Sequence, residues 1–232
     1  MVGIIAAMNI EAENLISAMK KPHREKIGAL EFVTGNINSE DCVVAVCGVG
    51  KVNAAVCTQT MILTYRPSRI INTGVAGGTD PRVNIGDIVL ASRLVQHDMD
   101  TTAVGDEPGL LSLPGGSRVY IETDRALLSR LEDICADMNQ TYITGTVATG
   151  DQFISGMEKR LSIGGKFGAL ACEMEGGAVA QTCYLSGVPF AVLRCISDGI
   201  SDGSDLMEYT EFAPMAAGKS AAILREFFNH KP

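Results

Sequence analysis

The hydrophobic positions of this chain fall into short runs that alternate with longer segments of mixed polarity. Four of these runs are apolar and rich in β-branched residues: Val2 to Met8, Arg69 to Thr73, Asp87 to Val95 and Ile143 to Ala148. Such runs are typical of buried strands in a parallel sheet, because a strand covered on both faces shows little alternation. Several of the segments between them have helical periodicity. The pattern therefore predicts an α/β protein.

The segments predicted as helices share an amphipathic or small-residue pattern with a capping or stop residue. They are Ile10 to about Lys20 with Asn9 as N-cap and Pro22 as stop, Lys51 to about Tyr65, Thr123 to Asn139 opened by a Thr or Asp cap, a short helix at Met157 to Leu161, Gly176 to Ser186, and Pro214 to Asn229. Leu30 to Gly35 and Cys42 to Cys47 alternate around a polar turn and predict an antiparallel hairpin. Asp205 to Phe212 is expected to be a polar connection.

One stretch, from Ala169 to Asp202, carries the densest group of candidate functional residues. Apolar runs at Phe167 to Cys172 and Pro189 to Ile196 flank a helical segment that Gly187 ends. A strand, helix and strand of this length predict a βαβ unit with parallel strands and a right-handed crossover.

Acidic residues follow both strands of this unit. Glu173 and Glu175 come after the first strand, and Ser197 and Asp198 come after the second. Ligands of open parallel sheets bind outside the carboxyl ends of the strands, so two or three carboxylates are expected in one cleft. Taken singly, Glu175 could instead favour a helix N-terminus, and Asp198 could form a turn.

Composition limits the remaining choices. The 232 residues suit a single domain, residues 1–232, which we expect to be a three-layer α/β/α domain with a central mixed, mostly parallel twisted sheet flanked by helices. The net charge of −8 argues against nucleic acid or an anionic membrane as partner. The N-terminal run lacks the features of a signal peptide, and no window has the length of a transmembrane helix.

Cysteine and histidine usage adds two expectations. The seven cysteines form no CxxC pair and mostly lie in apolar runs, which is typical of reduced, buried residues in a cytoplasmic protein. His23, His97 and His230 are far apart in the sequence, so no metal site and no cofactor are expected.

Several other motifs bear on the chemistry. Glu11 falls in the first turn of a helix at the end of the first strand, where it could either serve the helix dipole or act in catalysis. GVGK at Gly48 to Lys51 lacks the flanking residues of a phosphate-binding P-loop. GVAGG at Gly74 to Gly78 allows close approach of a ligand but does not match GxGxxG. The long segment His97 to Ser117 is expected to be a lid or a partner contact, with disorder as the alternative.

Seven segments, taken in order, resemble one family. They are GIIAAMNIEAE, INTGVAGG, VNIGDIV, HDMDTT, ATGDQFI, CEMEGGAVA and RCISDGISD. In this order they resemble the purine nucleoside phosphorylase and hydrolase superfamily, with the closest likeness to the 5′-methylthioadenosine/S-adenosylhomocysteine nucleosidases. The resemblance runs from about Val2 to Phe228. It implies hydrolysis of the N-glycosidic bond between adenine and a 5′-thio-substituted ribose.

The resemblance also implies roles for individual residues. Asp198 resembles the acid at adenine N7 with Ser197 orienting it, Glu11 the base that activates water, and Arg194 a residue near that water. Glu175 and Met174 resemble the residues at the ribose, and Phe153 and Ile154 the adenine pocket. Tyr209 and, from a second subunit, Pro114 resemble the wall around the 5′ substituent. Met8, Val75, Ala76, Gly77 and Glu173 complete the expected substrate-binding set.

The chemistry explains why these residue types are needed. Adenine anion is a poor leaving group, so an acid near N7 removes much of the barrier. Asp198 would have to hold a proton near neutral pH, which a cleft containing Glu175 and Asp202 would favour. The ribose gains oxocarbenium character, which nearby carboxylates stabilise.

The chain departs from the family pattern at two places. Val75 stands where the family usually has Ser, which helps to hold water, and Val104, Gly105 and Asp106 stand where it usually has FGY. These departures bear on water placement and on the 5′ specificity.

Three alternatives stay open beside the nucleosidase. They are a phosphate-dependent purine nucleoside phosphorylase, a futalosine-type nucleoside hydrolase and a non-catalytic nucleoside-binding module. The region of the first strand contains no arginine before Arg24, which favours water over phosphate as the second substrate. The resemblance implies a homodimer whose partners are a small nucleoside and water.

Overall fold

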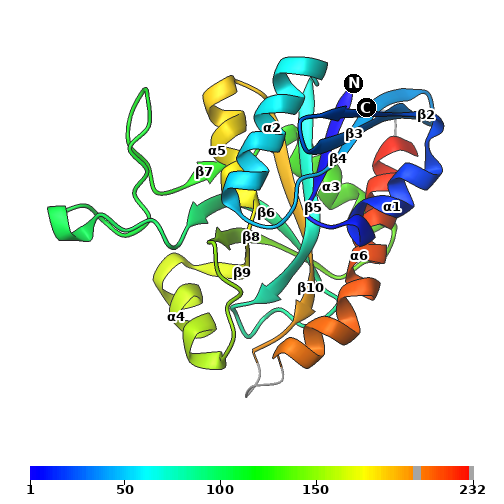
Figure 1. Cartoon of the computed structure of the whole chain (residues 1–232). Helices are drawn as coiled ribbons and strands as arrows, with labels where there is room; N and C mark the ends of the chain where they lie inside the picture. The colour runs from blue at the N-terminus through cyan, green and yellow to red at the C-terminus, as the bar shows by residue number, and fades with distance from the viewer. Residues whose placement is uncertain (201–204, 230–232) are drawn as a thin grey trace.

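The structure, a computed structural model, describes residues 1–200 and 205–229 of the chain. Its strands are β1 (Val2–Ala6), β2 (Lys20–Ile27), β3 (Leu30–Ile37), β4 (Glu40–Val46), β5 (Arg69–Gly78), β6 (Ile88–Gln96), β7 (Ile121–Glu122), β8 (Tyr142–Thr149), β9 (Ala169–Glu173) and β10 (Phe190–Asp198). Its helices are α1 (Asn9–Ala18), α2 (Lys51–Tyr65), α3 (Arg125–Asp137), α4 (Met157–Phe167), α5 (Gly176–Ser186) and α6 (Asp205–Asn229), with a short 3-10 turn at Thr102–Val104. Figure 1 shows the sheet between two groups of helices.

Two apolar cores lie on the two faces of the sheet, so the chain has three layers. On one face Met61 of α2 and Val179 of α5 are buried against the strands. On the other face the buried residues are Leu15 of α1, Leu131 of α3 and Phe227 of α6. The predicted α/β class with a mixed central sheet flanked by helices is confirmed.

The strand order explains how the site is built. In the described part of the chain the order is β10-β6-β8-β9-β5-β1-β4-β3-β2, and β10 also pairs with β5. The strands β5, β9, β8, β6 and β10 therefore close into a ring, from which β1, β4, β3 and β2 extend as an open sheet. The long strand β5 belongs to both parts, and its last residues, Gly77 and Gly78, pair with β9.

This topology corrects one prediction. β10 runs parallel to β5, whereas β9 pairs with β5 in the antiparallel sense, so β9 and β10 do not form the predicted parallel βαβ unit. The local pattern gave the strands and the helix, but the partners of each strand are set by closure of the ring. The carboxyl ends of β9 and β10 still reach the same cavity, described below, because both strands pair with the end of β5.

The first helix and the hairpin also differ from expectation. The N-cap of α1 is Met8 and not Asn9, and the helix ends at Ala18. Lys20–Ile27 forms the edge strand β2, which pairs with β3, where the sequence predicted only the end of the helix near Lys20 and a stop at Pro22. The hairpin therefore supplies two strands of a three-stranded antiparallel arrangement. β2 is polar and exposed along nearly its whole length, so it carries no hydrophobic signal.

Near the C-terminus the helical segments are longer than predicted. α4 continues to Phe167, and α6 begins at Asp205, so the expected polar connection from Asp205 to Phe212 is wrong. Pro214 lies inside α6 and does not start it. The segment His97 to Ser117 contains the 3-10 turn, its Leu111 forms a bridge with Arg118 just after it, and it projects from the body of the molecule in Figure 1. None of the helices in the described ranges is long and apolar enough to cross a membrane.

Candidate active site

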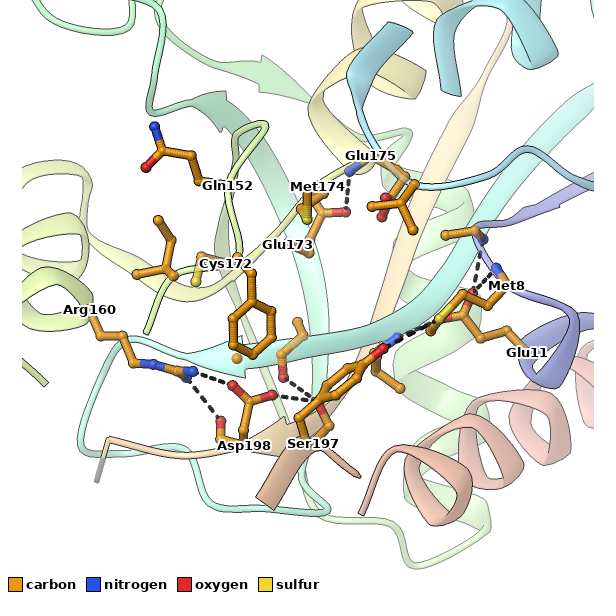
Figure 2. Close-up of a pocket in the computed structure, with 18 residues that line it drawn as sticks. Met8, Glu11, Gln152, Arg160, Cys172, Glu173, Met174, Glu175, Ser197 and Asp198 are labelled. Carbon is orange, nitrogen blue, oxygen red and sulfur yellow. Dashed lines mark hydrogen bonds and ion pairs between the residues drawn. The ribbon is translucent and has the colours of Figure 1, made fainter. Parts of the chain in front are cut away.

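A pocket with about 560 Å³ of empty space, part of it open to solvent, lies where β5, β9 and β10 end. Its lining comprises Ala7, Met8, Glu11, Val49, Val75, Ala76, Gly77, Gln152, Phe153, Ile154, Arg160, Cys172, Glu173, Met174, Glu175, Ser197, Asp198 and Tyr209. Figure 2 shows Glu11 and Asp198 on opposite sides of the pocket, with Glu173, Met174 and Glu175 along a third side.

Glu11 is held by backbone donors on two elements. Its Oε2 accepts hydrogen bonds from the N–H groups of Ala7 and Met8, both at 2.9 Å, so it completes the cap of α1. Its Oε1 accepts from the N–H of Val75 on β5 at 3.2 Å. Burial raises the pKa of Glu11, and these backbone hydrogen bonds oppose the shift. The side chain therefore caps the helix and also presents a fixed carboxylate to the pocket. Close approach is possible because a Cβ at Gly74 would lie 2.7 Å from Glu11 Oε1.

Asp198 ends β10 and has both carboxylate oxygens engaged. Ser197 Oγ donates to Asp198 Oδ1 at 2.6 Å, so the expected orienting contact is present. Asp198 Oδ2 forms an ion pair with Arg160 of α4, and both side chains are almost fully buried. The charged group in direct contact with Asp198 is thus the Arg160 cation. The sequence analysis expected carboxylates beside Asp198 instead. Asp202 lies outside the described residues.

Glu173 lines the pocket but is occupied by the protein itself. Its Oε2 accepts from the N–H of Gly176 at 2.7 Å and forms an ion pair with Arg194, and its Oε1 accepts from Thr149 Oγ1. Arg194 also donates to Asn72 Oδ1. Arg194 is 1 % exposed and is not among the residues that line the pocket. The pair therefore fixes the start of α5 beneath the site.

Glu175 is a buried carboxylate of the pocket whose pKa is raised. Its Oε1 accepts from the N–H of Gly50 at 3.0 Å, across from the turn that precedes α2. Burial and the negative charge of Glu173 raise the pKa of Glu175 to about 7. A group titrating there exchanges a proton near neutral pH, so its charge depends on conditions and on what binds.

One side of the pocket is apolar and aromatic. Phe153 and Tyr209 pack edge to face with ring centroids 5.5 Å apart, and Tyr209 Oη donates to Met8 Sδ at 3.3 Å. Ile154 is buried, while Phe153 is 47 % exposed and so forms an open wall. Burial raises the pKa of Tyr209, and the negative charges of Glu11 and Asp198 add to the shift. This side suits an apolar group and the flat face of a ring.

Most of the predicted residues meet in this pocket. Pro114 does not, because it is exposed on the projecting segment. Residues that the sequence analysis missed are Ala7, Val49, Gln152, Arg160 and Cys172. Gln152 and Cys172 are next to predicted site residues in the sequence and could have been found on that ground. Arg160 could not, because its sequence context is that of an ordinary surface position of a charged helix. Within residues 1–200 and 205–229, no group of three or more His, Cys, Asp or Glu side chains is arranged to hold a metal ion.

The family model of the phosphorylase superfamily matches residues 1–229. The chain belongs to this superfamily. A 5′-methylthioadenosine/S-adenosylhomocysteine nucleosidase of Haemophilus influenzae is 35% identical to this chain over 98% of both chains. A nucleosidase of the same name from Shewanella sediminis is 36% identical over 96% of both chains. The chain is thus related over its full length to nucleosidases of the superfamily.

Solved structures of the superfamily share the fold. A mutant of the Helicobacter pylori nucleosidase, with 5′-methylthioadenosine in its active site, has a TM-score of 0.92 at 31% identity and covers 98% of this chain and 97% of its own. The Streptococcus pyogenes S-adenosylhomocysteine nucleosidase, in complex with a methylthio derivative of tubercidin, has a TM-score of 0.92 at 32% identity, covering 100% of this chain and 97% of its own. A Helicobacter pylori futalosine hydrolase mutant also has a TM-score of 0.92, at 30% identity, covering 98% of both chains.

Proposed function

We propose that this protein hydrolyses the N-glycosidic bond of 5′-thio-substituted adenosines, namely 5′-methylthioadenosine and S-adenosylhomocysteine, to adenine and the thioribose. The observation that carries the proposal is the placement of Glu11 and Asp198 on opposite sides of one pocket. Displacement of adenine by water needs a proton donor behind the leaving group and a base on the side of the water. The nucleosidase relatives support the choice of substrate class.

In this proposal Asp198 gives a proton to adenine N7 while Glu11 removes a proton from the attacking water. Ser197 holds the acid by its 2.6 Å hydrogen bond, and the N–H of Val75 holds the base. Glu175 binds the ribose hydroxyls, and its negative charge stabilises the oxocarbenium character of the sugar. Such groups are effective because they are fixed before the reaction starts.

The remaining contacts divide between the two ends of the nucleoside. Phe153 and Ile154 hold the adenine ring, and Met174 packs on the sugar. Met8 and Tyr209 enclose the 5′ substituent, supported by their mutual contact at 3.3 Å. Arg194 acts through Glu173, to which it is paired, because it does not reach the pocket lining.

Water is favoured over phosphate by the state of the helix terminus beside the base. Phosphate binds at backbone N–H groups of helix N-termini and at arginines. Here the N–H groups of Ala7 and Met8 already donate to the Glu11 carboxylate. A phosphate bound here would be repelled by the Glu11 carboxylate, and the N–H groups of Ala7 and Met8 would not be available to it.

A panel of nucleosides tests the proposal. The purified protein is incubated with 5′-methylthioadenosine, S-adenosylhomocysteine, 5′-deoxyadenosine and futalosine, and base release is followed by chromatography. We expect the two thio-nucleosides to be cleaved fastest. Faster cleavage of futalosine would show that the proposed substrate is wrong. Futalosine is included because a futalosine hydrolase shares this fold. Tight binding of every nucleoside with no base release would instead favour a binding module.

We also propose that the protein is a homodimer in which the segment His97 to Ser117 completes the partner's 5′ pocket. The segment projects from the body and carries the exposed Pro114 and the strongly exposed Val104. Dilution into the nanomolar range should lower the specific activity in step with dissociation measured by mass photometry. A monomer with full activity would contradict this. The cytoplasmic location and the single-domain organisation likewise stay predictions.

A further inference from the structure

Arg160 is a guanidinium at the floor of the pocket, and it is 0 % exposed. It comes from α4, whose other charged residues, Glu158, Lys159 and Lys166, are exposed. Its Nη2 pairs with Asp198 Oδ2, and its Nη1 lies 3.3 Å from the backbone oxygens of Gly78 and Asp198. Figure 2 shows the guanidinium directed at the Asp198 carboxylate. The Arg160 guanidinium therefore contacts both the side chain and the backbone oxygen of Asp198 at the end of β10.

The surrounding backbone is shaped to admit this pair. A Cβ at Gly77 of β5 would lie 2.8 Å from Asp198 Oδ2 and closer still to Arg160 Nη1. Only glycine at this position leaves room for the ion pair beside the strand. A buried ion pair gives little net stability compared with well-packed apolar side chains, because both charges lose their water. Stability alone is thus a weak reason for placing an arginine here.

Resting on the proposed function, we propose that Arg160 is a positioning residue that aims the Asp198 carboxyl and stabilises the carboxylate formed as it gives up its proton. In the step concerned, the bond between C1′ and N9 breaks with its electron pair going to adenine, and the Asp198 proton moves to N7. The water oxygen bonds to C1′, and its proton goes to Glu11. The charge that develops on Asp198 meets a cation already in contact with it.

Within the bound complex the contribution falls in the proton-transfer step. Asp198 and Arg160 form an ion pair in the structure, so the cation also favours the carboxylate before the nucleoside binds. Once Asp198 carries its proton in the complex it gains little from the cation, whereas the carboxylate that forms again as the proton leaves gains much in a buried, poorly screened site. A group that acts in this way raises kcat and changes KM little. A residue that only holds α4 against β5 and β10 would affect binding, stability and turnover together.

The test compares Arg160→Met and Arg160→Lys with the wild type on 5′-methylthioadenosine. We expect the Met variant to lose about 10- to 100-fold in kcat with KM changed less than about threefold. The Lys variant should recover part of kcat, because it restores the charge without the two-armed contact. Equal kcat for wild type and the Met variant overturns the inference and leaves the proposed function standing. A wild type that releases no adenine overturns both.

Two further measurements separate this role from a structural one. The affinity for 5′-methylthiotubercidin, in which carbon replaces N7, should stay within about twofold in the Met variant, since that ligand takes no proton from Asp198. In single-turnover assays with excess enzyme, adding Arg160→Met to Asp198→Asn should cost no further rate, because Asn cannot become anionic. Loss of tubercidin binding in parallel with kcat, or fully additive losses in the double variant, would overturn the inference. If the Met variant does not fold, the Lys variant in the same two measurements decides.

Discussion

Replacing Glu175 with Gln should raise thermal stability above pH 7 and leave it nearly unchanged near pH 4.5. Burial and the adjacent Glu173 raise the pKa of Glu175 to about 7 from an ordinary 4.5. The native state therefore holds this proton more tightly than the unfolded chain does. The stability that the proton supplies is complete below pH 4.5, falls as the pH rises, and is lost above about pH 7. Gln carries no charge and avoids that loss.

The size of the effect follows from the two pKa values. A difference between 4.5 and about 7 corresponds to about 3 kcal/mol of unfolding free energy, at about 1.4 kcal/mol per pKa unit. For a chain of 232 residues this is a rise in Tm of roughly 5 to 10 °C above pH 7. The Gln carbonyl can still accept the hydrogen bond from the N–H of Gly50, so the local geometry is retained.

Differential scanning calorimetry of both proteins between pH 4.5 and 8.5 measures the difference directly. Glu13→Gln makes the same chemical change at an exposed position of α1 and serves as control, with an expected effect within about 0.5 kcal/mol at every pH. A Tm difference for Glu175→Gln that is flat across the pH range would refute the reasoning. A variant less stable than wild type at pH 8 would refute it more strongly.

Three further predictions concern the acid, the water and the space around the acid. Asp198→Asn should lower kcat by about a hundredfold or more while nucleoside binding is largely kept, and retention of more than about a tenth of kcat would place the acid elsewhere. Val75→Ser should raise kcat on 5′-methylthioadenosine with KM little changed, because a hydroxyl beside Glu11 can help to hold the water; kcat unchanged or lowered on every nucleoside would contradict this. Gly77→Ala should cost at least about tenfold in kcat by displacing the Arg160–Asp198 pair, whereas Gly165→Ala, where a Cβ meets nothing within 4 Å, should keep full activity. Steady-state kinetics of the four variants test these predictions. Equal kcat for Gly77→Ala and Gly165→Ala would contradict the prediction about the space around Asp198.

The sequence predicts most elements because burial leaves a strong pattern. β1 and β10 are buried along their whole lengths, and both appear as apolar runs. The edge strand β2 was missed because seven of its eight residues are exposed, so it carries charged and polar side chains that no strand pattern reports. β2 is a strand because it pairs with β3, and this tertiary contact cannot be predicted from the local sequence pattern.

Strand partners were the other limit. A segment's pattern shows whether it is buried, but not which strand lies beside it. β9 and β10 were expected to be parallel neighbours, yet each pairs with β5 in an opposite sense because the strands close into a ring. At the C-terminus the sequence predicts a helix from Pro214, but α6 already runs through this residue from Asp205.

Most of the predicted site residues line the cavity, although five lining residues were missed. Glu11, Glu175 and Asp198 follow strands, and the ends of strands meet at one cavity. Arg160 could not be found in this way. It belongs to a short charged helix, and only the packing of α4 beside β9 brings its guanidinium to Asp198.

The central claim is that this chain cleaves a 5′-thio-adenosine with water, using Asp198 and Glu11. The direct measurement is adenine release from 5′-methylthioadenosine in phosphate-free buffer, by the wild type and by Asp198→Asn side by side. The account predicts a wild-type kcat/KM of at least about 10⁴ M⁻¹s⁻¹, unchanged when phosphate is added, and a loss of about a hundredfold or more in kcat in the variant. Adenine release that requires phosphate, or that is as fast without the Asp198 carboxyl as with it, would contradict the claim.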